Sequence, residues 1–267
     1  MTTLAYALLD GWVVAKRNLI KIKRIPDLLL FSTLQPIMFV VLFAYVFGGA
    51  IPIPGVNYRE YLMAGIFAQT VMFGSGITAI GLADDLQKGI IDRFRSLPMS
   101  RAAVLIGRTT SDLLNNLLVL LVMVICGLLV GWRTHTNALE ITAGFLLLLA
   151  FGYAISWVAA VIGLSVRNVE VAQSAGLIWM FPVTFLSNAF ISTSTLPSWL
   201  RPVADWNPFS SVVLALRDLW GNAPAALARG EGFPADHPIL LSVLYIAVML
   251  AIFVPLSIAK YRKAAGK

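Results

Sequence analysis

Residues 140–165 read EITAGFLLLLAFGYAISWVAAVIGLS, and this stretch decides the fold. Its one charged residue is Glu140, at the first position. A helix that crosses the hydrocarbon core of a bilayer needs about 20 consecutive apolar residues, whereas a helix on the surface of a soluble protein keeps a polar face. The stretch is long enough and apolar enough to predict a membrane-spanning helix.

Five other runs have the same character, and none of them contains Asp, Glu, Lys or Arg. They lie near residues 28–50, 61–83, 113–132, 172–191 and 239–259. We therefore predict an all-α integral membrane protein with six transmembrane helices. Its transmembrane domain covers residues 28–259, after an N-terminal segment 1–27 and before a basic tail, 260–267.

The composition supports this fold class. Of the 267 residues, 59% are hydrophobic and 12% are charged, against about 25% charged in an ordinary soluble domain. The mean hydropathy is +0.84. The net charge of +7 comes from basic residues in short segments between the apolar runs. That distribution favours contact with a membrane surface and argues against nucleic acid as a partner.

The basic residues also predict the orientation, because Lys and Arg are enriched in cytoplasmic loops. With both termini in the cytoplasm, the cytoplasmic segments hold 15 of the 20 Lys and Arg residues. The outer segments then hold Arg59, Arg133, Arg201, Arg217 and Arg229. An even number of spans agrees with this arrangement.

Two segments outside the spans predict helices of another kind. Residues 1–27 place Trp12 on an apolar stripe and Lys16 and Arg17 away from it, so we expect an amphipathic helix on the membrane surface. The outer segment 192–238 contains Asn207-Pro208, a typical helix start. We predict a short interfacial or re-entrant helix from there to Trp220, before the last span.

Several kinds of chemistry are disfavoured by the sequence. A proton-coupled transporter needs a titratable group inside its spans, and the six runs have none; sodium coupling through neutral oxygens stays open. The histidines, His135 and His237, fall in predicted outer loops, and Cys126 is the single cysteine. No Gly-x-x-x-x-Gly-Lys-Ser/Thr phosphate loop occurs. We expect no catalytic, cofactor or metal site on this chain.

The segment between the second and third runs, residues 84–101, reads DDLQKGIIDRFRSLPMSR. Acidic residues lead it and Pro98 ends it, as in a short helix. Ile90, Phe94 and Leu97 are spaced to share one face. From the residues alone, two interpretations are open: a helix lying on the inner leaflet, or a docking surface for another protein.

At this point the chain resembles a known family. Residues 88–101, KGIIDRFRSLPMSR, resemble the signature of ABC-2 type permeases, in particular the daunorubicin-resistance branch of actinobacteria. Residues 196–208, LPSWLRPVADWNP, and the order of the elements are similar to the same family. The resemblance implies one permease half of a drug-efflux exporter in the bacterial plasma membrane. A second permease copy or paralogue and two separate ATPase subunits, which bind ATP and Mg, would complete it.

The resemblance also implies roles for particular residues. Trp12, Lys16 and Arg17 would belong to an interface helix near the ATPase. The segment 84–101 would be a coupling helix seated on the ATPase. The residues implied in coupling are Asp85, Lys88, Gly89, Ile90, Asp92, Arg93, Phe94, Arg95, Pro98 and Arg101.

The lining chemistry of the apolar runs favours a hydrophobic or amphiphilic cargo, either a drug or a lipid-like metabolite. Candidate path residues are Phe39, Phe43, Phe73, Trp179, Phe181 and Phe185, and each of them also suits lipid contact or helix packing. Three alternatives remain: an exporter of a polysaccharide or glycolipid from the same superfamily, a membrane assembly subunit without a transport role, and a lipid-modifying enzyme with an unrecognised site.

Overall fold

The computed structural model describes residues 26–47, 53–90, 101–225, 229–230 and 232–264. Helices are the regular elements of these ranges. The proposed interface-helix residues Trp12, Lys16 and Arg17 lie outside the described residues. So do Asp92, Arg93, Phe94, Arg95 and Pro98 of the coupling segment.

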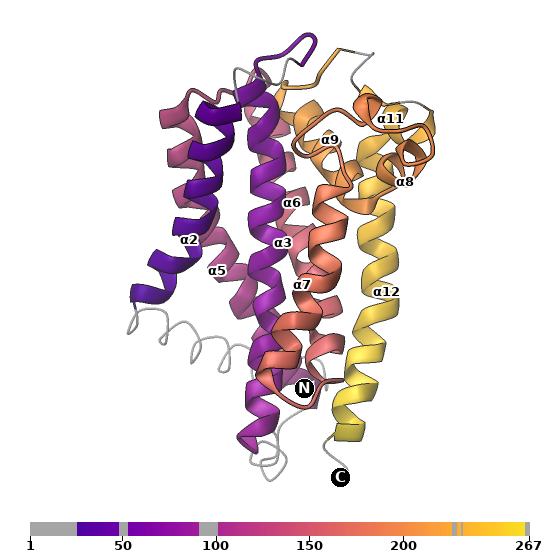
Figure 1. Ribbon diagram of the computed structural model, residues 1–267. Helices are drawn as coiled ribbons and strands as arrows, with labels where there is room; N and C mark the ends of the chain where they lie inside the picture. The colour runs from indigo at the N-terminus through magenta and orange to yellow at the C-terminus, as the bar shows by residue number, and fades with distance from the viewer. Residues whose placement is uncertain (1–25, 48–52, 91–100, 226–228, 231, 265–267) are drawn as a thin grey trace.

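Long helices run side by side in the bundle of Figure 1, and short ones gather at one end of it. The long helices are α2 (Pro26–Val41), α3 (Tyr58–Gln87), α5 (Arg101–Val130), α6 (Ala138–Gly163), α7 (Val169–Phe185) and α12 (Pro238–Ala264). The short elements are the π-helix η1 (Leu42–Phe47), the 3₁₀-helix η2 (Thr193–Thr195), α8 (Arg201–Asp205), α9 (Pro208–Trp220) and α11 (Phe233–Asp236).

Four helices in the described ranges are long and apolar enough to cross a membrane: Tyr58–Gln87, Val104–Val130, Ala138–Gly163 and Pro238–Lys263. Two shorter apolar helices, Thr33–Val46 and Val169–Phe185, overlap the remaining predicted runs. The 17 residues of α7 give a helix of about 25 Å, shorter than the ~30 Å hydrocarbon core. The all-helical, multi-span fold is confirmed, and the count of six spans stays a prediction.

Helix α5 begins earlier than its predicted apolar run. It starts at Arg101, whereas the run starts near residue 113. The first turns of α5 carry Arg108 and Asp112, which lower the hydropathy of any sequence window without breaking the helix. Composition alone therefore placed these two residues outside the predicted apolar run, although the helix and the candidate span include both.

Helix α7 ends earlier than predicted, at Phe185 rather than near residue 191. Asn207 explains where it stops. Its side-chain Nδ2 donates to the carbonyl oxygens of Val183 (2.7 Å) and Leu186 (2.8 Å), which lie at the end of α7. Its Oδ1 accepts from the backbone N–H of Phe209 at 2.9 Å and so caps α9, as the sequence predicted. One side chain thus terminates one helix and begins another.

Helix α3 is the central element of the bundle and packs against α2, α5, α6, α7 and α9. Its residues from Tyr61 to Met72 are all buried. Glycines bring other segments into backbone contact with it: Gly65 lies against the backbone of Ala189, and Gly163 of α6 lies against the backbone of Ala79. Small residues at such crossings let helices approach closely in membranes.

Candidate functional site

Six phenylalanine rings form a continuous arc from α2 through η1 and α7 to α3, which we call the aromatic arc. Consecutive rings have centroids 4.8–5.8 Å apart, within the usual range for aromatic pairs. In order, the rings are Phe39, Phe43, Phe190, Phe185, Phe181 and Phe73. Five of them were predicted path residues; Phe190 was not, although it lies inside the predicted run 172–191.

Trp179, the remaining predicted path residue, lies apart from these ring contacts. It packs against the main hydrophobic cluster. Its indole N–H is buried and finds no hydrogen-bond partner among the residues that the structure describes.

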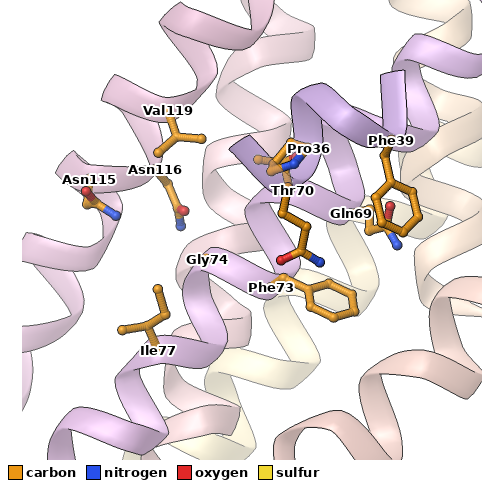
Figure 2. A pocket seen from close by; sticks show the side chains of 11 residues that line it. Pro36, Phe39, Gln69, Thr70, Phe73, Gly74, Ile77, Asn115, Asn116 and Val119 are labelled. Carbon is orange, nitrogen blue, oxygen red and sulfur yellow. The ribbon is translucent and has the colours of Figure 1, made fainter. Parts of the chain in front are cut away.

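A cavity of about 180 Å³ lies between α2, α3 and α5. Phe39 and Phe73, the two ends of the aromatic arc, both line it (Figure 2). The complete lining is Gln35, Pro36, Phe39, Gln69, Thr70, Phe73, Gly74, Ile77, Asn115, Asn116 and Val119. Four side-chain amides therefore face a hollow between apolar helices, and composition gave no indication of them.

One of these amides also joins two helices. Asn116 Nδ2 donates to the hydroxyl of Ser75 at 2.9 Å, linking α5 to α3. Gly74 leaves the space that the Asn116 side chain occupies, because a Cβ on Gly74 would collide with it. Gly74 therefore allows close packing between α3 and α5.

Nearer the start of α5 than this cavity, α5 and α3 share a charged cluster. Arg108 Nε lies 3.4 Å from Asp112 Oδ2, and the Thr78 hydroxyl donates to the same oxygen. The two charged side chains are largely buried, with 17% and 12% of their surface exposed. The pair lies on the candidate span Val104–Val130, before the start of the predicted run 113–132. The i, i+4 spacing of the pair on one helix was the signal that a search for uncharged runs discards.

The end of the bundle that carries α8, α9 and α11, which is the outer end in the predicted orientation, contains a second buried charge. Arg217 of α9 is fully buried. Its Nε and Nη2 donate to the carbonyl oxygens of Tyr61 and Ala189, each at 3.0 Å. Its guanidinium carbon lies 3.3 Å from the centroid of the Tyr61 ring. The sequence places Arg217 on the short helix predicted in the outer segment, and its spacing from Val213 and Trp220 puts it on the buried face of α9.

The predicted short outer helix is confirmed by α9, but its surroundings differ from an interfacial position. Residues 209–217 and Trp220 of this helix are all buried. The helix packs against α3, α6 and α12. It therefore belongs to the core of the bundle.

The opposite end of the bundle gathers basic side chains around a hollow of about 430 Å³. The hollow is lined by Leu86, Gln87, Leu164, Ser165, Val166, Arg167, Lys260 and Lys263, which come from the ends of α3, α6 and α12 and from the α6–α7 connection.

The described part of the coupling segment starts at the same end. Lys88 caps α3 and pairs with Asp84 at 2.8 Å. Gly89 then turns the chain with a φ of +63°, a left-handed conformation that favours glycine. Ile90 ends the described part, and the chain resumes at Arg101, the first residue of α5. The segment 88–101 thus connects two neighbouring helices at the basic end.

Metal chemistry finds no support in the described ranges, where no three His, Cys, Asp or Glu side chains come together as ligands. The polar features around the cavity are instead amides and hydroxyls, which suit hydrogen bonding to a bound molecule.

Comparison with known proteins identifies the family of this chain. Residues 10–219 match the family model described as ABC-2 type transporter. The chain is 30% identical over 246 residues, 92% of its length and 83% of the relative, to a daunorubicin resistance ABC transporter permease protein, DrrB1, of Streptomyces coeruleorubidus.

More distant relatives agree. The doxorubicin resistance ABC transporter permease protein DrrB of Mycobacterium tuberculosis is 28% identical over 208 residues, 77% of this chain and 71% of the relative. A putative transport permease, ycf38, of Porphyra purpurea is 25% identical over 215 residues, 78% and 73% of the two chains. The chain belongs to the ABC-2 type transporter family.

Proposed function

We propose that this chain is the membrane-spanning permease subunit of an ATP-binding cassette exporter whose cargo is a hydrophobic or amphiphilic small molecule. The observation that carries the proposal is the family match combined with the aromatic arc and the cavity at its ends. Names of two relatives refer to daunorubicin and doxorubicin resistance. Both drugs have a fused aromatic ring system with polar groups, and such molecules suit a site of this lining.

In this proposal the energy enters at the basic end of the bundle. A separate ATPase subunit docks on residues 84–101, and its movement is transmitted to α3 and α5, the helices that this segment connects. Arg93 and Arg95 pair with acidic residues of the ATPase, and Phe94 fills an apolar groove on it. The basic residues Arg167, Lys260 and Lys263 at the same end support a cytoplasmic position for it. The chain then crosses the membrane six times, with both termini inside.

The assembly has two such permeases, identical or paralogous, and two ATPase subunits. ATP and Mg bind to the ATPase, and this chain performs no hydrolysis. Helices α2, η1 and α7 carry exposed apolar side chains, among them Met38, Val46 and Ile178, which suit lipid or the second permease.

The test is reconstitution of the permease into lipid vesicles, together with a separately purified ATP-binding cassette ATPase as its candidate partner. We expect ATP-dependent movement of doxorubicin, and loss of that movement in Phe94→Ala and Arg93→Glu. A buried aromatic anchor contributes about 2 kcal/mol to an interface, so Phe94→Ala should weaken ATPase binding about 30-fold.

Phe233→Ala is the matched control, because Phe233 is an exposed phenylalanine in α11, outside the coupling segment. Membrane insertion should be normal in all variants. Normal export by Phe94→Ala and Arg93→Glu, with the ATPase still bound, would remove the coupling assignment. An absence of ATP-dependent transport by the wild type would refute the proposed function itself.

A further inference from the structure

The cavity between α2, α3 and α5 contains amide groups that the surrounding helices leave without hydrogen bonds. Gln69 is 7% exposed, and its side chain makes no hydrogen bond to any residue that the structure describes. The half-buried Asn115 amide is in the same situation, facing the cavity from α5. By contrast, the neighbouring Asn116 and Thr70 bond to Ser75 and to the Ile66 carbonyl.

Buried amides without partners are costly, so almost all of them in folded proteins are hydrogen-bonded to protein, water or ligand. The Gln69 amide is not one of the fully enclosed polar groups of the described residues, so it is open to a hydrogen bond with a molecule in the cavity. A volume of about 180 Å³ holds several waters, at roughly 30 Å³ each in the liquid, or part of a larger ligand. The aromatic walls favour the ligand, because Phe39 and Phe73 place flat apolar surfaces beside the amides.

The cavity also has a way in. Gln35 on its α2 side is exposed, and Ile77 on its α3 side is 40% exposed. Phe181, whose ring contacts Phe73 edge to face at 5.4 Å, is 41% exposed. A flat apolar molecule therefore has a surface of aromatic rings that leads from the outside of this chain to the amides.

We infer that this cavity is a recognition site for the hydrogen-bonding edge of an amphiphilic aromatic cargo. Gln69 and Asn115 bond to hydroxyl or carbonyl groups of the cargo, and Phe39 and Phe73 pack against its rings. The inference rests on the proposed function and narrows its cargo: an aromatic molecule with hydroxyl or carbonyl groups is preferred over an equally apolar one without them. Since amides are neutral and both donate and accept, the selection is by hydrogen bonding rather than by charge.

The experiment compares two cargoes on the full permease–ATPase complex. Doxorubicin carries hydroxyl and carbonyl groups on fused rings, whereas tetraphenylphosphonium has aromatic rings and no hydrogen-bonding group. Gln69→Met keeps the length and apolar stem of the side chain but removes the amide. We expect it to weaken doxorubicin binding and transport about tenfold, the effect of losing a hydrogen bond to a buried group. The binding and transport of tetraphenylphosphonium should change by less than about twofold.

Asn115→Leu should also weaken doxorubicin binding and transport more than those of tetraphenylphosphonium. The factor should be smaller, because Asn115 is less buried. Gln173→Met is the matched control, since Gln173 is an exposed glutamine of α7 that does not line the cavity. It should leave the binding and transport of both cargoes unchanged. Elution of each variant as a single species in detergent verifies folding.

Equal losses for both cargoes in Gln69→Met would show that Gln69 acts through packing, and would overturn the inference. Unchanged doxorubicin binding would overturn it too, because the cavity would then hold water alone. Binding to the purified permease is measured separately from transport. A wild type that binds doxorubicin but does not transport it refutes the proposed function, while the Gln69→Met binding shift still decides the inference. A wild type with no saturable doxorubicin binding overturns the inference directly.

Discussion

Aromatic side chains serve two different purposes in two regions of this molecule. At the outer end, Phe67, Trp132 and Trp220 meet edge to face, with centroids 5.1–5.5 Å apart, and all three are buried. Along α7, Phe181 and Phe185 stack with nearly parallel rings 5.7 Å apart, and 41% and 45% of their surfaces are exposed. We call the first region the outer core; the second is the aromatic arc.

The difference shows how one apolar composition supports both stability and binding. Edge-to-face packing on several sides fixes each ring of the outer core, and buried hydrogen bonds such as that from Trp132 Nε1 to Asn222 Oδ1 (3.1 Å) orient them. In the arc, Phe181 and Phe185 stay partly exposed, and the two end rings, Phe39 and Phe73, line a cavity. We therefore expect substitutions in the outer core to reduce stability, and substitutions in the arc to reduce transport.

The largest effect should come from Arg217→Ala in the outer core. The substitution leaves the Ala189 carbonyl without its hydrogen bond and empties the space over the Tyr61 ring. We expect a loss on the order of 3 kcal/mol in the free energy of unfolding, measured as a lower temperature of aggregation in detergent. Arg201→Ala is the control, because the exposed Arg201 also donates to a backbone carbonyl, that of Leu196. Equal thermal stability of the two variants would contradict the assignment of a stabilising role in the outer core to Arg217.

Gly65→Ala should have the next largest effect. Its Cβ would enter the space of the Ala189 carbonyl, which belongs to backbone and cannot rotate away. We expect a loss of about 2 kcal/mol from overpacking. Gly176→Ala in α7 provides the opposite case, since its Cβ would meet no described atom within 4 Å; the better helix propensity of alanine should leave stability unchanged or slightly higher. Thermal unfolding of both variants in the same detergent makes the comparison.

The smallest change in stability should accompany Phe185→Ala in the arc. Because Phe185 is 45% exposed, we expect a loss below about 1 kcal/mol. Doxorubicin transport should nevertheless fall about threefold, because the arc is interrupted between Phe181 and Phe190 and a stacked ring contact contributes about 0.5–1.5 kcal/mol. Ile178→Ala, a 74% exposed position on the same helix outside the arc, should not alter transport. A larger effect on stability than on transport would show that Phe185 serves mainly to stabilise the fold, and would contradict its role in the arc.

The sequence predicted the helical fold because long apolar runs leave few alternatives in a bilayer. Asn207-Pro208 also predicted the start of α9 correctly, since capping depends on neighbouring residues. The second bond of Asn207, to the end of α7, joins residues 24 positions apart and has no local signature.

The buried charges were missed for a related reason. Arg217, Arg108 and Asp112 were assigned by hydropathy, which describes a segment, whereas their burial depends on which helix packs against them. The arc was partly predicted, because large aromatic residues are visible in sequence. The cavity amides were not, since Gln and Asn on a helix say nothing of whether a neighbour satisfies them.

The two hydrogen bonds that Asn207 donates to the end of α7 form a connection between the two regions. Its amide holds two carbonyl oxygens at the end of α7, 2.7 and 2.8 Å away, and the same residue begins α9. Such bonds resist separation but tolerate modest rotation. If α7, which carries two rings of the arc, moves during transport, these two bonds keep its end next to Asn207 attached to α9. Movement would then be greatest at the opposite end of α7, near the basic hollow, and least at Asn207.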